Sequence, residues 1–152
     1  MKKVLIAVDY HPNATEVVKA GYDLAKTLNA KVCLLHVVME FGYYNTQYPT
    51  FMGYDSFSME SNLNIHKDLL EVSNNYLTKI SGYLEDPQVE TRTEEGETAN
   101  TILDYAKKWN ADMIVMGTHS HSVLEKLLMG NVAKKVLEHS HIPIYMVPIK
   151  NK

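Results

Sequence analysis

Apolar residues stand side by side in several stretches of the chain. They fill Val4–Val8, most of Lys31–Val38 and Met113–Met116, without the alternation expected of a strand with one face in water. Short continuous apolar runs are typical of parallel strands that are covered on both faces. A fourth run, Ile144–Val147, has the same character. These runs predict strands of a parallel sheet.

Helical spacing fills the segments between these runs. Asn13-Ala-Thr-Glu16 has the spacing of a capping box, and apolar residues three and four positions apart follow it as far as Leu28. A helix from Gly96-Glu-Thr98 onwards is predicted in the same way. A longer amphipathic helix is predicted over Ser61 to Glu85, where apolar residues again recur every three or four positions: Ile65, Leu69, Val72, Tyr76, Ile80 and Tyr83.

Gln88–Glu94 alternates charged and weakly apolar residues, as edge strands do to discourage mispairing. Strands and helices therefore alternate along the chain, which is the pattern of an α/β domain. We expect one domain over residues 1–152, containing a single doubly wound, five-stranded parallel sheet with helices on both faces. A chain of 152 residues is long enough to bury a core without disulfides or metal.

The segment 39–60 shows neither a helical nor an alternating period and is predicted to be a long aromatic-rich loop. Two interpretations are open: a cover packed over the end of the sheet, or a lid or partner-binding surface. Its aromatic residues are Phe41, Tyr43, Tyr44, Tyr48, Phe51, Tyr54 and Phe57.

Composition argues against several classes of function. The net charge is −3 and the basic residues are scattered, so no basic stripe predicts nucleic-acid binding. No run approaches the length of a membrane span, and the first strand is too short for the apolar core of a signal peptide. We therefore expect a cytoplasmic protein with no membrane partner. The single cysteine, Cys33, lies in an apolar run and is expected to be a small buried hydrophobe.

The strand that ends at Gly117 opens into a polar loop, residues 118–122. Gly117 predicts a point where the backbone passes close to another group. Ser122-Val-Leu-Glu125 has capping-box spacing, and Gly130-Asn131 offers a second helix start with Asn131 as the N-cap of Val132 to Glu138. Free amide groups at such helix starts, with the positive end of the helix dipole, favour phosphate.

Asp9 ends the first strand, at the edge where open α/β sheets bind ligands. Its carboxylate is interpreted either as an acceptor within loop 10–13 or as a ligand-binding group.

His36 interrupts an apolar run and is expected to be a hydrogen-bonded core histidine. We expect no metal site at His119-x-His121 or His139-x-His141, because neither pair is completed by a carboxylate or a cysteine.

The glycine-containing segment resembles a known family. Gly117-x2-Ser120-x9-Gly130-Asn131 is similar to the signature Gly-x2-Gly-x9-Gly-(Ser/Thr) of the universal stress protein family. The opening Lys3–Asp9, the strand Leu35–Val38 and the closing Ile144–Val147 also resemble that family. The resemblance implies a Rossmann-like fold, like that of the adenine nucleotide alpha hydrolases, with strand order 3-2-1-4-5 and a switch point between strands 1 and 4.

The resemblance also implies a ligand, ATP or a related adenine nucleotide, with or without magnesium. Asp9 would bind the ribose, Val37 and Met116 would pack on the base, and the Gly117 region would hold phosphates. The implied partner contact is a homodimer through the last strand, Ile142 to Pro148. The candidate nucleotide-binding residues are Ala7, Asp9, Val37, Met116, Gly117, His119, Ser120, Gly130, Asn131 and Val132.

Two functions follow from this resemblance. One is a nucleotide-binding regulator or sensor of the stress response, and the other is a relative without nucleotide that acts as a protein-interaction module. Because the chain has none of the common nucleotide-loop or nucleophile motifs, we expect at most slow ATP hydrolysis. Ser120 and Asn131 depart from the family pattern, so binding is expected to be retained but weakened by about tenfold or more.

Overall fold

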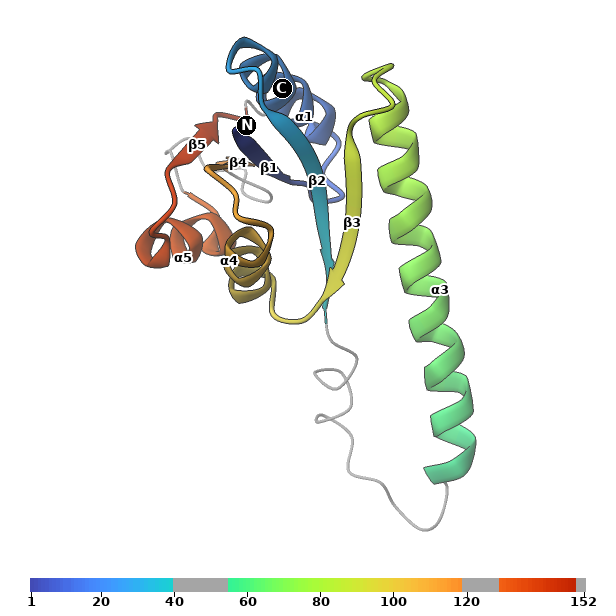
Figure 1. Ribbon diagram of the computed structural model, residues 1–152. Coiled ribbons are helices and arrows are strands. Elements are labelled where there is room, and N and C mark those ends of the chain that lie inside the picture. Colours follow the sequence, from blue (N-terminus) through green and yellow to red (C-terminus); the bar gives the residue numbers. More distant parts are fainter. Residues whose placement is uncertain (40–54, 119–128, 150–152) are drawn as a thin grey trace.

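The computed structural model describes residues 1–39, 55–118 and 129–149, and for residues 55–63 only the backbone. The described strands form one five-stranded parallel sheet in the order β3-β2-β1-β4-β5 (Figure 1). The predicted fold class and strand order are therefore confirmed. The strands are β1 (Lys3–Ala7), β2 (Lys31–Val38), β3 (Glu90–Glu95), β4 (Met113–Gly117) and β5 (Ile144–Val147).

Helices cover both faces of this sheet. Helices α1 (Ala14–Thr27) and α3 (Asp55–Gly82) pack on one face, and α4 (Thr98–Trp109) and α5 (Asn131–His139) pack on the other. Figure 1 shows α3 running beside β3 and continuing past the end of the sheet. Among the helices of the described residues, none combines the length and apolarity that a membrane crossing requires.

The core consists of two clusters, one on each face of the sheet. Successive residues of a strand point to opposite faces, so an inner strand covered on both sides must be apolar throughout. In β1, Val4 and Ile6 join the cluster under α1 and α3, while Leu5 joins the cluster under α4 and α5. The continuous apolar runs therefore reflect burial on two sides.

Helix α3 differs from its prediction at its start and in its buried face. It begins at Asp55, so the predicted loop 39–60 extends too far; no proline or glycine separates Asp55 from Ser61. Residues 40–54 lie outside the described part of the chain. The face against the sheet carries Ser73, Leu77 and Ile80. Most of the predicted apolar stripe is exposed instead: Ile65, Leu69, Val72 and Tyr83.

Three local predictions have different outcomes. Asn13 is the N-cap residue of α1, but its side chain makes no capping hydrogen bond, because its backbone is not extended (φ −92°, ψ 12°). The predicted capping box is therefore wrong. His36 is a buried histidine whose Nδ1 lies 2.6 Å from the Val8 carbonyl oxygen, as predicted. Cys33 is fully buried, and burial raises the pKa of its thiol to about 11.

Candidate functional site

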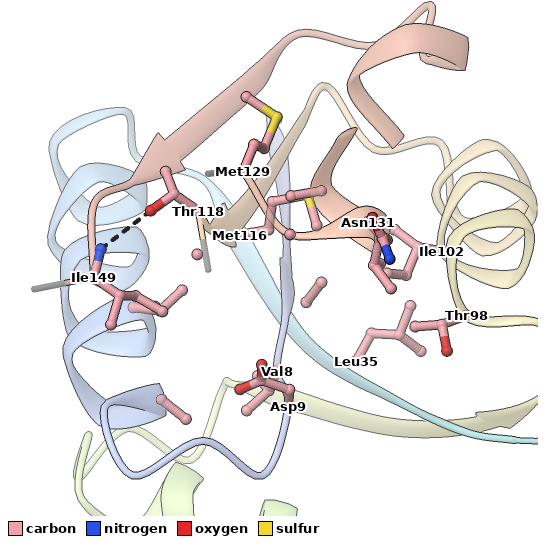
Figure 2. A pocket seen from close by; sticks show the side chains of 17 residues that line it. Val8, Asp9, Leu35, Thr98, Ile102, Met116, Thr118, Met129, Asn131 and Ile149 are labelled. Carbon is pink, nitrogen blue, oxygen red and sulfur yellow. Dashed lines mark hydrogen bonds between the residues drawn. The ribbon is translucent and has the colours of Figure 1, made fainter. Parts of the chain in front are cut away.

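A cavity of about 480 Å³ lies at the carboxyl ends of β1 and β4, where the starts of α1, α4 and α5 converge. Figure 2 shows Asp9 and Asn131 well apart across this cavity, with Leu35 in the space between them. The described residues that line it are Ala7, Val8, Asp9, Ala14, Val17, Leu35, Thr98, Ile102, Met116, Gly117, Thr118, Met129, Gly130, Asn131, Val132, Ala133 and Ile149. Asp9 is the only charged side chain among them.

The turn after β1 places Asp9 at the cavity. Val8 continues the parallel ladder, since its amide donates to the Leu35 carbonyl at 2.8 Å. One carboxylate oxygen of Asp9, Oδ1, accepts from the His11 amide at 3.0 Å. The interpretation of Asp9 as an acceptor within its own loop is therefore correct for one oxygen. That bond also fixes the carboxylate at the edge of the cavity.

The turn after β4 is held by three hydrogen bonds around Thr118. Its amide donates to the Val147 carbonyl at 3.0 Å, and its carbonyl accepts from the Gly130 amide at 2.9 Å. Its hydroxyl accepts from the Ile149 amide at 3.3 Å, as drawn in Figure 2. These bonds join the end of β4 to the start of α5 and to the residues after β5.

Gly117 is needed for a close approach, as predicted, but the group that approaches belongs to the chain itself. A Cβ atom at Gly117 would lie 2.5 Å from Cδ1 of Ile149 and 3.1 Å from Cγ2 of Val17. Both of these side chains line the cavity. The glycine therefore lets two apolar side chains close one wall of the site.

Helix α5 begins without a side-chain cap. Its N-cap is Gly130, which has extended backbone (φ −57°, ψ 153°) and no side chain to offer. The predicted N-cap, Asn131, is instead the first helical residue, because the Lys134 amide already donates to the Gly130 carbonyl at 2.9 Å. The first-turn amides of Asn131, Val132 and Ala133 have no acceptor within the helix, and these three residues line the cavity.

Helix α4 also begins at the cavity, where Thr98 and Ile102 contribute to the lining. Its N-cap residue is Glu97, whose Oε2 accepts from the Asn100 amide at 2.8 Å. The same carboxylate lies 3.3 Å from Nζ of Lys135 on α5. The Asn100 amide, more than Lys135, lowers the pKa of Glu97. The positive end of α4 is thus matched by a carboxylate of the protein.

The predicted site residues divide into three groups. Val37 does not line the cavity; it packs in the core under α4, and Leu35, two residues earlier on the same face, reaches the cavity instead. His119 and Ser120 lie outside the described residues. The predicted residues that line the cavity are Ala7, Asp9, Met116, Gly117, Gly130, Asn131 and Val132.

Sequence reasoning missed part of the lining. Thr98 had a usable signal, because it follows the end of a strand, where this fold places its ligands. The others are mostly apolar residues with no distinguishing pattern: Val8, Ala14, Val17, Leu35, Ile102, Thr118, Met129, Ala133 and Ile149.

No cluster of three or more histidine, cysteine or carboxylate side chains in the described ranges is arranged to hold a metal ion. In the His139-x-His141 pair, Nδ1 of His139 lies 2.8 Å from the Lys135 carbonyl oxygen of its own helix. The His119-x-His121 pair falls outside the described residues.

Sequence comparison relates the chain to known proteins. The model of the universal stress protein family matches residues 1–148. Universal stress protein MJ0531 of Methanocaldococcus jannaschii is 32% identical over 149 residues, covering 96% of this chain and 81% of that protein. Universal stress protein A of Escherichia coli strain K12 is 28% identical over 153 residues, covering 99% and 96%.

Solved structures show the same similarity. The structure of hypothetical protein MJ0577 has a TM-score of 0.76 at 27% identity, covering 99% of this chain and 98% of that one. A universal stress protein in complex with cAMP has a TM-score of 0.61 at 16% identity, covering 96% of both chains. Since the family model spans nearly the whole sequence, the chain belongs to the universal stress protein family.

Proposed function

We propose that this protein is a stress-response regulator or sensor that binds ATP or a related adenine nucleotide in the cavity between β1 and β4. The observation that carries the proposal is the uncapped start of α5. Its first-turn amides face a cavity in which the described residues supply no basic side chain. Among the described residues, the backbone donors and the helix dipole at this start, with nearby hydroxyl and amide side chains, are therefore the groups that would attract phosphate.

The rest of the lining fits the other parts of such a ligand. Met116, Leu35 and Ile102 offer an apolar wall for the base, with Leu35 in the place that the sequence assigned to Val37. Asp9 would accept a hydrogen bond from a ribose hydroxyl through the oxygen that His11 does not engage. A related fold holding cAMP supports the adenine nucleotide class.

Magnesium would bind together with the nucleotide phosphates, because the described residues of the protein do not supply a full set of ligands around it. Asp9 is the only carboxylate among the described lining residues, whereas magnesium keeps most of its water and takes one or two carboxylates together with phosphate oxygens. The proposed site residues are those predicted from the sequence, with His119 and Ser120 included and with Leu35 replacing Val37 at the base.

Calorimetry with ATP, ADP, AMP and cAMP, with and without magnesium, tests this function. We expect the wild type to bind and the Ser120→Gly, Asn131→Ser double variant to bind about tenfold more tightly, since both changes restore the family pattern. If neither protein binds at millimolar nucleotide, the cavity is not a nucleotide site.

We also propose a homodimer through the last strand, residues 142–148. Strand β5 is at the edge of the sheet, where unpaired backbone groups favour pairing with another strand, and Tyr145 is exposed. Tyr145→Glu should shift the sedimentation mass towards one chain without changing the fold. A wild type that sediments as a single chain at micromolar concentration would refute the dimer.

The second candidate function is a protein-interaction module. It is favoured by the exposed apolar residues Ile65, Leu69 and Val72 on α3, a helix that continues past the end of the sheet. This second function is supported if the Ser120→Gly, Asn131→Ser double variant binds ATP and the wild type does not. Ser120 and Asn131 would then have abolished nucleotide binding in this chain.

A further inference from the structure

Two consecutive carbonyl groups in the turn after β1 are each bound by a side chain from another element. The Val8 carbonyl lies 2.6 Å from Nδ1 of His36 on β2, and the Asp9 carbonyl accepts from the Tyr76 hydroxyl on α3 at 2.5 Å. Because a carbonyl is only an acceptor, Nδ1 of His36 must carry the proton. Turn carbonyls are usually solvated, so two side-chain donors in succession fix this backbone unusually firmly.

The ring of Tyr10 packs against both of these donors. Its centroid lies 4.3 Å from that of His36 and 4.8 Å from that of Tyr76. The separation from Tyr76 is within the range of favourable tilted ring pairs, and the His36 ring is closer still. Tyr10, His36 and Tyr76 therefore form a ring cluster, and none of the three lines the cavity.

The donors of the ring cluster keep their protons at neutral pH. Burial, followed by the charge of Asp9, raises the pKa of Tyr76 to about 12, so the hydroxyl stays a donor. Burial lowers the pKa of His36, so this ring is neutral. Neither Tyr76 nor His36 lines the cavity, whereas Val8 and Asp9 both do.

We propose that Tyr76 is a positioning residue that sets the carboxylate of Asp9 for ribose binding, with His36 holding the preceding carbonyl. The inference rests on the proposed function of the cavity. A carboxylate that accepts a hydrogen bond from a specific ligand hydroxyl must be positioned to within a fraction of an ångström. Such accuracy comes from neighbouring residues that hold the ligand-binding residue in place. Helix α3 is thereby part of the nucleotide site, although none of its described side chains reaches the cavity.

The test is Tyr76→Phe, which keeps the ring and removes only the hydroxyl. Tyr22→Phe is the matched control, because the Tyr22 hydroxyl donates to Oδ2 of Asp86 at 2.7 Å, away from the cavity. Calorimetry would measure the dissociation constants of ATP, 2′-deoxy-ATP and 3′-deoxy-ATP for the wild type, both variants and Asp9→Ala.

We expect Tyr76→Phe to weaken ATP binding by about fivefold and to reduce the preference for ATP over one of the deoxy analogues. Tyr22→Phe should leave both quantities unchanged. Since Tyr76 acts through Asp9, the Asp9→Ala, Tyr76→Phe double variant should bind no more weakly than Asp9→Ala alone.

Other outcomes distinguish the positioning role of Tyr76 from the proposed nucleotide site. If the wild type discriminates against a deoxy analogue but Tyr76→Phe behaves like Tyr22→Phe, the positioning role is wrong and the nucleotide site stands. An equal weakening of ATP and both analogues by Tyr76→Phe also overturns it, because the hydroxyl would then support the cavity as a whole. If the wild type binds no adenine nucleotide at millimolar concentration, the proposed function fails and this inference with it.

Discussion

Two helices, α4 and α5, start at the same cavity, but only the start of α4 has a side-chain cap. Helix α4 starts at Glu97, whose carboxylate accepts from the Asn100 amide and pairs with Lys135. Helix α5 starts at Gly130, which offers its amides no side-chain acceptor. Both starts carry the same partial positive charge, and in both the first-turn amides have no acceptor inside the helix.

We interpret this difference as one structural feature, the start of a helix, used for two purposes. At α4 the amide donors are used within the protein, so they contribute to stability. At α5 the N-cap residue of the described chain makes no side-chain cap, so we expect the protein to forgo about 1 kcal/mol of capping energy there and to attract anions instead. If this interpretation is right, the two starts must respond in opposite ways to the same kinds of substitution.

The largest effect is expected from Asn131→Asp, which gives the first turn of α5 a carboxylate of nearly the same shape. The new charge would repel phosphate, so we expect the dissociation constant of ATP to rise by about tenfold or more. The free energy of unfolding should rise by about 0.3–1 kcal/mol, because an acid at a helix start is stabilising. Calorimetry and urea denaturation measure the two changes.

Asn100→Asp is the control for this variant. It makes the same change in the first turn of α4, adds the same net charge, and lies outside the cavity lining. Nucleotide affinity should change little in that variant. Equal affinities of the two variants for ATP would show that α5 does not hold the phosphates.

A smaller effect is expected from Glu97→Ala, and it should appear in stability. Loss of the cap on the Asn100 amide should lower the free energy of unfolding by about 0.5–2 kcal/mol, with nucleotide affinity nearly unchanged. Glu138→Ala is the matched control: Glu138 is also an exposed glutamate near a lysine, 3.9 Å from Lys134, but caps no helix. Urea denaturation that found the same loss in both variants would count against a capping role.

The smallest effect is the pH dependence of that cap. The pKa of Glu97 is lowered in the folded protein from an ordinary value of 4.5, so the folded state favours the charged form. Its stabilisation is full above pH 4.5 and is lost as the pH falls through the folded pKa. The difference in unfolding free energy between wild type and Glu97→Ala should therefore shrink as the pH is lowered below 4.5. A difference that stays constant would assign the effect to packing.

The sequence by itself identified the strands and the end of the sheet where the cavity lies. Continuous apolar runs identified the inner strands, because burial on both faces leaves no position for a polar residue, and the charged alternation of Gln88–Glu94 identified an edge strand. Asp9 and Gly117 indicated the end of the sheet where the cavity lies, because parallel strands place all their carboxyl ends at one edge. These features depend on local spacing, which a single sequence records.

Only the tertiary structure determined which side chains are buried against the sheet, which line the cavity and which bind distant backbone groups. In α3, residues 65, 69, 73 and 77 follow one helical row at spacings of four, and contact with the sheet decides that Ser73 and Leu77 are buried while Ile65 and Leu69 are exposed. Leu35 and Val37 share a face of β2 and are buried in the same core cluster, but of the two only Leu35 lines the cavity. The carbonyl of Asp9 is 67 residues from the hydroxyl that binds it. Such contacts depend on how elements far apart in the chain pack together, and local periodicity carries no information about them.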